Sequence, residues 1–212
     1  MTTDAVIRKW GVPFSSVPVP GDRYREFGGR VPDALLEAWR KFGFAGFAKG
    51  LWWLCDPVAW QPAVDTWTAD LELDPGPDRW CAVTRSAFGQ LSLWGDRTGM
   101  ALTINPVFGT IFPDDQSDEM DSQFDRDLQL YSALLTQQAR ALDIDGDDEV
   151  GLFDRVLERL GPVGPDTMYA FAPVPALGGP MIPENVEIAD AEVHMQILSE
   201  TTPRQIMANP YR

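Results

Sequence analysis

The sequence predicts an α+β protein in which N-terminal helices pack on an antiparallel β-meander, followed by a smaller, mainly helical and acidic C-terminal domain. Three observations give this prediction. Apolar residues recur at helical spacing near the N-terminus, short β-prone runs punctuated by glycine follow, and the chain then becomes acidic and helical. We place the boundary after Pro113, which divides the chain into residues 1–113 and 114–212.

The N-terminal region opens with helices. Residues 3–10 form a short amphipathic helix ended by a glycine and a proline, and residues 22–27 form another helical turn. A third helix starts after Pro32, which suits a first turn, and ends at Gly43. Its apolar residues recur at helical spacing: Leu35, Leu36, Trp39 and Phe42.

The next region mixes turns, a strand and a helix. The run GFAGFAKG has glycines that permit tight turns, and residues 51–55 form a short apolar run typical of a buried strand. Asp56 and Pro57 then open a helix. Residues 79–113 contain β-prone runs separated by glycine or Asn-Pro, which predict an antiparallel meander.

Beyond Pro113 the pattern is helical. A helix predicted to reach Leu142 follows a run of carboxylates, which favour the positive end of a helix dipole. A second helix covers residues 152–160, a strand residues 168–174, and a last helix precedes Pro203. The first of these helices is expected to bury one apolar face: Phe124, Leu128, Tyr131, Leu134 and Leu135.

Charge divides the chain more sharply than hydrophobicity does. Residues 1–113 contain 12 acidic and 11 basic side chains, whereas residues 114–212 contain 20 and 6. Almost all of the net charge of −15 therefore lies in the second part. Such a field repels nucleic acid and anionic membranes and speeds the encounter with a basic partner, so the sequence predicts a cationic protein partner.

The sequence lacks the signals of a secreted or membrane protein. Cys55 and Cys81 are its only cysteines and form no CxxC pair, which favours reduced, buried thiols. The N-terminal run MTTDAVIRKWG has no apolar core of signal-peptide length. We expect a cytoplasmic protein.

Several catalytic frameworks are excluded by residue type. With His194 as the single histidine, the chain alone builds no histidine-based triad and no histidine zinc cluster. GxSxG, GxxxxGK[ST] and GxGxxG motifs are absent, and GFAGFAKG departs from a phosphate loop after Lys49. His194 is expected to be a packing residue with a hydrogen bond. We therefore expect a non-enzyme without cofactor.

Two acidic runs are the candidate partner-binding residues. The alternative for each is a solvated helix start or turn. The predicted toxin-binding residues are Asp114, Asp115, Asp118, Glu119, Asp121, Asp125, Asp143, Asp145, Asp147 and Asp148.

The second run also has a metal-binding interpretation. Asp143, Asp145 and Asp147 alternate as in the first half of a calcium-binding EF-hand loop. Asp148 stands where that loop needs glycine, and Asp154 stands where it needs a bidentate glutamate. A metal-dependent enzyme that uses these carboxylates is the first alternative function.

An ordered series of landmarks resembles a known family. Trp10, Gly11 and Pro13, followed by VPDALLEAWRKFGFAGFAKGLWWLCDP and AVTRSAFGQLSLWGDRTGMALTINPVFGTIFP, is similar to the GAD-like domain of bacterial immunity proteins. The remainder, including GLFDRVLERLGPVGPDTMYAFAPVPALGGP, resembles the C-terminal domain of type VI secretion immunity proteins. A more distant likeness is to SMI1/KNR4-like immunity proteins.

The resemblance implies a protein that binds and neutralises a cognate secreted toxin, such as a DNase effector, in a stoichiometric complex. A nuclease binds a polyanion, so its substrate groove is basic and attracts an acidic protein. The resemblance carries no catalytic residues. A general interaction module without a toxin partner is the second alternative function, and the sequence carries no signal for an oligomeric state.

Overall fold

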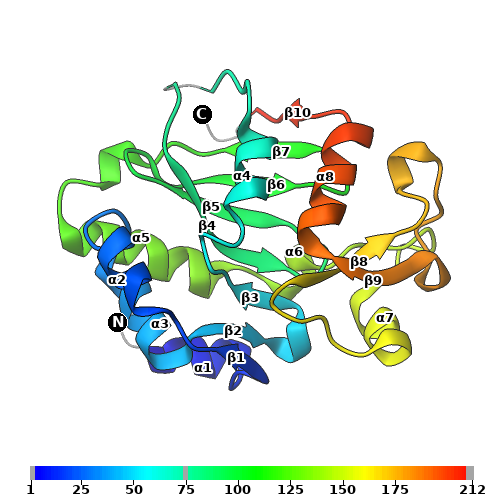
Figure 1. The fold of residues 1–212 in the computed structure, drawn as a ribbon, viewed down its shortest axis with the longest axis horizontal. Helices are drawn as coiled ribbons and strands as arrows, with labels where there is room; N and C mark the ends of the chain where they lie inside the picture. The colour runs from blue at the N-terminus through cyan, green and yellow to red at the C-terminus, as the bar shows by residue number, and fades with distance from the viewer. Residues whose placement is uncertain (1–2, 74–75, 209–212) are drawn as a thin grey trace.

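A central eight-stranded sheet organises the computed structural model, which describes residues 3–73 and 76–208 (Figure 1). Its neighbouring strands are antiparallel, except that the last one pairs in parallel with β7. A separate antiparallel pair consists of β8 (Thr167–Phe171) and β9 (Val186–Asp190). In spatial order the large sheet contains β1 (Ser15–Val17), β2 (Phe44–Phe47), β3 (Trp52–Leu54), β4 (Trp80–Ser86), β5 (Leu91–Gly95), β6 (Gly99–Asn105), β7 (Thr110–Pro113) and β10 (Gln205–Ile206).

Helices cover both faces of this sheet. Figure 1 shows α4 (Gln61–Thr68) and α8 (Ala191–Thr201) in front of it and α5 (Gln123–Thr136) behind. The remaining helices are α1 (Thr3–Trp10), α2 (Gly21–Phe27), α3 (Asp33–Phe42), α6 (Ala139–Leu142) and α7 (Phe153–Leu160), with short 3₁₀ turns η1 (Ala48–Gly50), η2 (Ser117–Glu119), η3 (Pro175–Leu177) and η4 (Pro183–Asn185).

The two faces of the sheet create two hydrophobic clusters. Successive side chains of a strand point to opposite faces, and in β4 Cys81 and Val83 join the cluster with α3 and α5. Trp80 and Ala82 join the cluster with α4 and α8. This double burial explains why β4 lacks an alternating polar pattern.

Tryptophans near the N-terminus bind the helices that follow Pro113. The indole of Trp10 stacks on Trp52 at 5.2 Å and donates a hydrogen bond of 2.9 Å to the Leu134 carbonyl of α5. The indole of Trp67 donates to the Met195 carbonyl of α8 at 3.2 Å. Both clusters therefore contain residues from either side of Pro113. The division into residues 1–113 and 114–212 as folding units stays a prediction.

The α+β class and the antiparallel meander are confirmed, and several boundaries differ from those predicted. The run GFAGFAKG forms strand β2 followed by η1, instead of only tight turns. Helix α4 begins at Gln61, because the Asp56 carboxylate accepts the Val58 N–H and holds residues 57–60 in turns. The helix predicted to reach Leu142 breaks after Thr136 and resumes as α6.

Candidate protein-binding surface

The first acidic run forms an ordered segment between β7 and α5. We call residues 114–125 the acidic segment. Asp118 and Glu119 lie in η2, and both are exposed, as is Asp121. The half-buried Asp115 accepts hydrogen bonds from the amide and hydroxyl of Ser117, at 3.0 and 3.1 Å.

The two ends of the acidic segment are also fixed locally. The Asp114 carboxylate accepts a hydrogen bond of 2.7 Å from the Gln116 amide. At the other end, the Ser122 hydroxyl caps α5 by accepting the Asp125 N–H at 3.2 Å. The carboxylate of Asp125 in turn accepts the Ser122 hydroxyl. A cap of this kind fixes where α5 begins, and with it the direction of the first helical turn.

Gln129, a buried residue of α5, ties the acidic segment to the sheet. Its side-chain N–H₂ donates to the carbonyls of Gln116 and Glu119, at 3.0 and 2.7 Å. Its carbonyl accepts the Met100 N–H of β6 at 3.3 Å. Gly99 lies directly against this amide with φ +77°, so a side chain there would collide with Gln129. One glutamine thus connects the acidic segment, α5 and β6.

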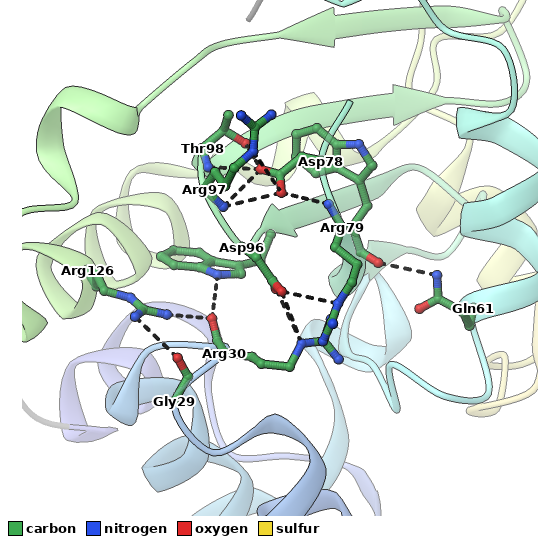
Figure 2. Close-up of polar contacts among 11 residues, drawn as sticks. Gly29, Arg30, Gln61, Asp78, Arg79, Asp96, Arg97, Thr98 and Arg126 are labelled. Carbon is green, nitrogen blue, oxygen red and sulfur yellow. Dashed lines mark hydrogen bonds and ion pairs between the residues drawn. The ribbon is translucent and has the colours of Figure 1, made fainter. Parts of the chain in front are cut away.

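Two neighbouring residues of α5 bind the N-terminal helices. The Asp127 carboxylate accepts the Ala34 N–H at 2.9 Å, which satisfies a free donor at the start of α3. The Arg126 guanidinium donates to the carbonyls of Gly29 and Arg30 (Figure 2). Together with Gln129, these contacts attach α5 to the scaffold from two sides.

The same contacts belong to a larger network at the end of the β4–β6 strands. Arg30 also accepts the Trp94 indole N–H at its carbonyl, at 3.0 Å, and its side chain pairs with Asp96 at 3.3 Å. Arg79 pairs with Asp96 at 3.2 Å (Figure 2). These residues were not predicted from the sequence. The GDRTG turn that contains Asp96 was the available signal, because a tight hairpin concentrates polar groups.

The Asp78 carboxylate binds the residues of that hairpin turn. It accepts the N–H groups of Arg97 and Thr98, each at 3.0 Å, and the Thr98 hydroxyl at 2.7 Å. Figure 2 shows these bonds converging on one carboxylate. We interpret the network as a structural clamp for the strands on which α5 rests.

Helix α5 exposes two of the apolar residues that were predicted to be buried. Phe124 is 74% exposed and Leu128 is 49% exposed, so this part of the prediction was wrong. The helix instead buries Gln129, Leu130, Tyr131 and Leu134. Because Gln129 turns toward β6, the stripe that contains Phe124 and Leu128, four residues apart, faces outward. We call these two residues the α5 apolar pair; it lies beside the carboxylates of the acidic segment.

The second acidic run lies apart from the first. Helix α5, which is 14 residues and roughly 20 Å long, and then α6 separate the two runs along the chain (Figure 1). Asp143 accepts the Phe153 N–H at 2.8 Å, at the start of α7, and burial raises the pKa of its carboxyl. The two predicted runs therefore do not form one continuous site.

The remaining carboxylates of the second run have separate partners. Asp145 pairs with Arg140 at 2.8 Å, and Asp148 with Arg155 at 3.0 Å. Asp147 accepts the Met181 N–H at 3.1 Å. Within residues 3–73 and 76–208, no three His, Cys, Asp or Glu side chains are grouped as metal ligands. The geometry of the run thus does not favour a calcium loop.

His194 is buried on α8, as predicted. Its Nε2 has no hydrogen-bond partner among the described residues, so the predicted hydrogen bond at this atom is not found. Burial lowers the pKa of the imidazole. Burial also raises the pKa of the Cys55 and Cys81 thiols to about 12, and both are free thiols. Because the thiolate is the reactive form, we expect both cysteines to be unreactive in the folded protein.

None of the helices formed by the described residues combines the length and the apolar character that crossing a membrane requires.

Comparison with known proteins identifies the family. The model of the GAD-like domain matches residues 1–108, and the model described as T6SS immunity protein Tdi1, C-terminal, matches residues 125–202. The chain belongs to the GAD-like domain family, whose model covers half of its length. Its C-terminal part, residues 125–202, is similar to the C-terminal part of the T6SS immunity protein Tdi1.

A solved structure shares the whole fold. The crystal structure of Atu4351 from Agrobacterium tumefaciens superimposes with a TM-score of 0.87 and 22% sequence identity, over 99% of this chain and 95% of that chain. At this identity the likeness concerns the fold alone. No curated protein sequence gave a significant match.

Proposed function

We propose that this protein is an immunity protein that binds and neutralises a cognate type VI secretion effector in a stoichiometric complex in the bacterial cytoplasm, without catalysis and without a cofactor. The match of residues 125–202 to an immunity-protein model supports the role. The structural observation that carries the proposal is the α5 apolar pair, exposed beside the acidic segment on a helix that the scaffold holds in place.

In the proposed contact, charged and apolar side chains affect different rate constants. Exposed carboxylates such as Asp118, Glu119 and Asp121 attract a basic partner over long range and mainly raise the association rate. Phe124 and Leu128 supply apolar anchors that lose water on contact and mainly lower the dissociation rate. Asp114, Asp115 and Asp125 extend the negative surface of the acidic segment.

A DNase effector fits this chemistry. An enzyme that holds DNA needs a basic groove, and the acidic protein attracts that groove by the same electrostatics. The second run, Asp143, Asp145, Asp147 and Asp148, is the weaker candidate for the interface. Two of its carboxylates already pair with Arg140 and Arg155, and Asp143 is half-buried. We therefore place the contact at the acidic segment and the α5 apolar pair.

Co-expression with the product of the adjacent effector gene tests the role. We expect the wild-type protein to relieve the toxicity of the effector and to co-purify with it at equal stoichiometry. A chain that neither relieves toxicity nor co-purifies would leave the proposal without support, and a general interaction module would then be the better description.

Variants of α5 and α8 test the location. Phe124→Ala with Leu128→Ala should raise the dissociation rate by about tenfold or more, because buried apolar anchors contribute most of the binding energy. Val193→Ala with Ile197→Ala is the matched control, because these residues are also four apart on a helix and are 59% and 42% exposed. An equal effect of both double variants, or an effect of the α8 pair alone, would move the interface away from α5.

Charge reversal tests the steering. Asp118→Lys with Asp121→Lys should slow association at low salt and have little effect at high salt, since exposed charges are screened. The same exchange at Asp145 and Asp147 serves as the comparison and should have the smaller effect. A larger effect of the second exchange would assign steering to the other acidic run.

A further inference from the structure

A cavity of about 340 Å³ lies between the N-terminal strands, α4 and the start of α8. Volumes in this range are typical of sites for small molecules. Its opening is marked by exposed residues, among them Asp166 and Glu192. Its walls come from both regions that match family models. The apolar part of the wall is formed by Phe44, Leu54, Cys55, Trp60 and Ala63.

Arg85 is the unusual residue of this wall, because it is charged and only 1% exposed. Its guanidinium lies 5.0 Å from the ring centres of both Trp53 and Trp60. It donates hydrogen bonds to the carbonyls of Ser86 and Gly164. Among the ion pairs of the described residues, none involves Arg85.

A buried guanidinium without a direct ion pair is costly, although the Asp166 carboxylate acts on it electrostatically, and it has more N–H donors than its two carbonyl partners use. Burial lowers the pKa of Arg85 to about 10, so the side chain is still cationic at neutral pH. A negative group in the cavity would compensate this charge.

The start of α8 lies at the same cavity. Ala191 and Glu192, the first residues of this 11-residue helix, line the cavity. The N-terminal end of a helix carries partial positive charge from its free N–H groups. Two of these N–H groups are already bonded here, to the Asp166 carbonyl and to the Asp190 carboxylate, so Arg85 is the main positive group at the cavity.

The carboxylates at the rim oppose this potential only weakly. Asp56 is engaged by the Arg23 guanidinium, at 2.9 and 3.3 Å, and Asp190 caps α8 by accepting the Val193 N–H at 3.0 Å. Asp166 and Glu192 are exposed, so water and salt screen their charges. A buried charge such as Arg85 is screened less by water and salt than these exposed carboxylates are.

We propose that this cavity binds a small organic carboxylate with an apolar body. The carboxylate pairs with Arg85 through charge-assisted hydrogen bonds, and the apolar body packs against Phe44, Leu54 and Trp60. This site is independent of the proposed effector interface, which lies on α5.

Matched ligands test the proposal on the unmodified protein. Phenylacetate and hexanoate should raise the melting temperature and give calorimetric dissociation constants of about 1 mM or tighter. Phenylacetamide and hexanamide, which have the same bodies without the charge, should bind about tenfold more weakly or worse. If acids and amides bind equally, or if neither acid binds at millimolar concentration, the proposal is wrong.

Variants at the opening of the cavity test whether it prefers an anionic or a cationic ligand, and they leave Arg85 unchanged. Asp166→Asn with Glu192→Gln removes two exposed negative charges and should tighten phenylacetate binding at low salt. If these changes weaken the binding of phenylacetate, the rim favours a cationic ligand and the proposal fails. Arg85→Met should abolish the preference for acid over amide, provided that its circular dichroism spectrum matches that of the wild type. A folded Arg85→Met variant that keeps the preference would also overturn the proposal.

Discussion

Replacing Gln129 with alanine removes the side chain that ties the acidic segment to β6. Its three hydrogen bonds reach the carbonyls of Gln116 and Glu119 and the N–H of Met100. A hydrogen bond contributes about 1 kcal/mol net, and an unpaired buried group costs about 1–3 kcal/mol. Water can reach the two carbonyls, since Gln116 and Glu119 are not buried, whereas the Met100 N–H is less accessible within the sheet. We expect a loss of about 2–3 kcal/mol.

The loss is large against a typical total stability of about 5–15 kcal/mol, so urea unfolding followed by tryptophan fluorescence will resolve it. Gln123→Ala is the matched control on the same helix, because the Gln123 amide bonds to the Asp127 carboxylate at an exposed position, at 3.0 Å. Its effect should stay within about 0.5 kcal/mol. Equal stabilities of the two variants would refute the idea that Gln129 anchors the segment.

Three further predictions concern buried or capping groups. Asp127→Ala should cost about 1 kcal/mol in thermal unfolding, because the Ala34 N–H at the start of α3 loses its acceptor, whereas exposed Asp118→Ala should have almost no effect. Burial lowers the pKa of His194 below 6.5, so the neutral imidazole contributes its full share of the folding stability above that pH. This share is lost as the pH falls from 6.5 toward the folded-state pKa. His194→Gln should therefore flatten this part of the plot of unfolding free energy against pH. Because burial raises the pKa of Cys55 and Cys81 to about 12, a thiol-specific disulfide reagent at pH 8 should react only at the rate of unfolding, and a fast reaction in the native state would contradict this burial.

Local signals in the sequence were sufficient for most of the helices and for the meander. Helix α3 begins after Pro32 and ends before Gly43, as the proline and glycine predict, and its periodic residues are all buried. Strands β4 to β7 are joined by short turns, so each pairs with its neighbour in the chain. Elements of this kind depend on interactions between residues that are close in sequence.

Strands that depend on distant partners could not be predicted in this way. Strand β10 has two residues and pairs with β7, about a hundred positions earlier in the chain. Strand β1 has three residues and pairs with β2 beyond two helices. Runs this short carry no measurable alternation, and their pairing is decided by the fold around them.

The acidic residues of the candidate site could be predicted from the sequence, but the apolar residues exposed beside them could not. A count of carboxylates predicts where negative charge gathers, and most of those residues are indeed exposed or half-buried. The α5 apolar pair was misassigned because Phe124 and Leu128 match helical spacing as well as the buried residues do. The face that is buried contains Gln129, a polar residue whose side-chain carbonyl bonds to β6, together with Leu130, Tyr131 and Leu134. Periodicity identifies a helix, whereas tertiary contacts determine its rotation.

The side chains of helix α5 that bind the scaffold point in other directions than the two that we propose to contact the effector. Asp127 and Gln129 point toward α3 and β6, where each binds a backbone N–H of the scaffold. Phe124 and Leu128, on the same helix, point to solvent. A surface held in this way loses little conformational entropy when a partner binds, so more of the contact energy appears as affinity. Under the proposed function, the region with the family landmarks supports binding without touching the effector. Weakening the Asp127 or Gln129 contacts should reduce affinity by loosening α5, whereas Phe124→Ala should reduce it with stability unchanged.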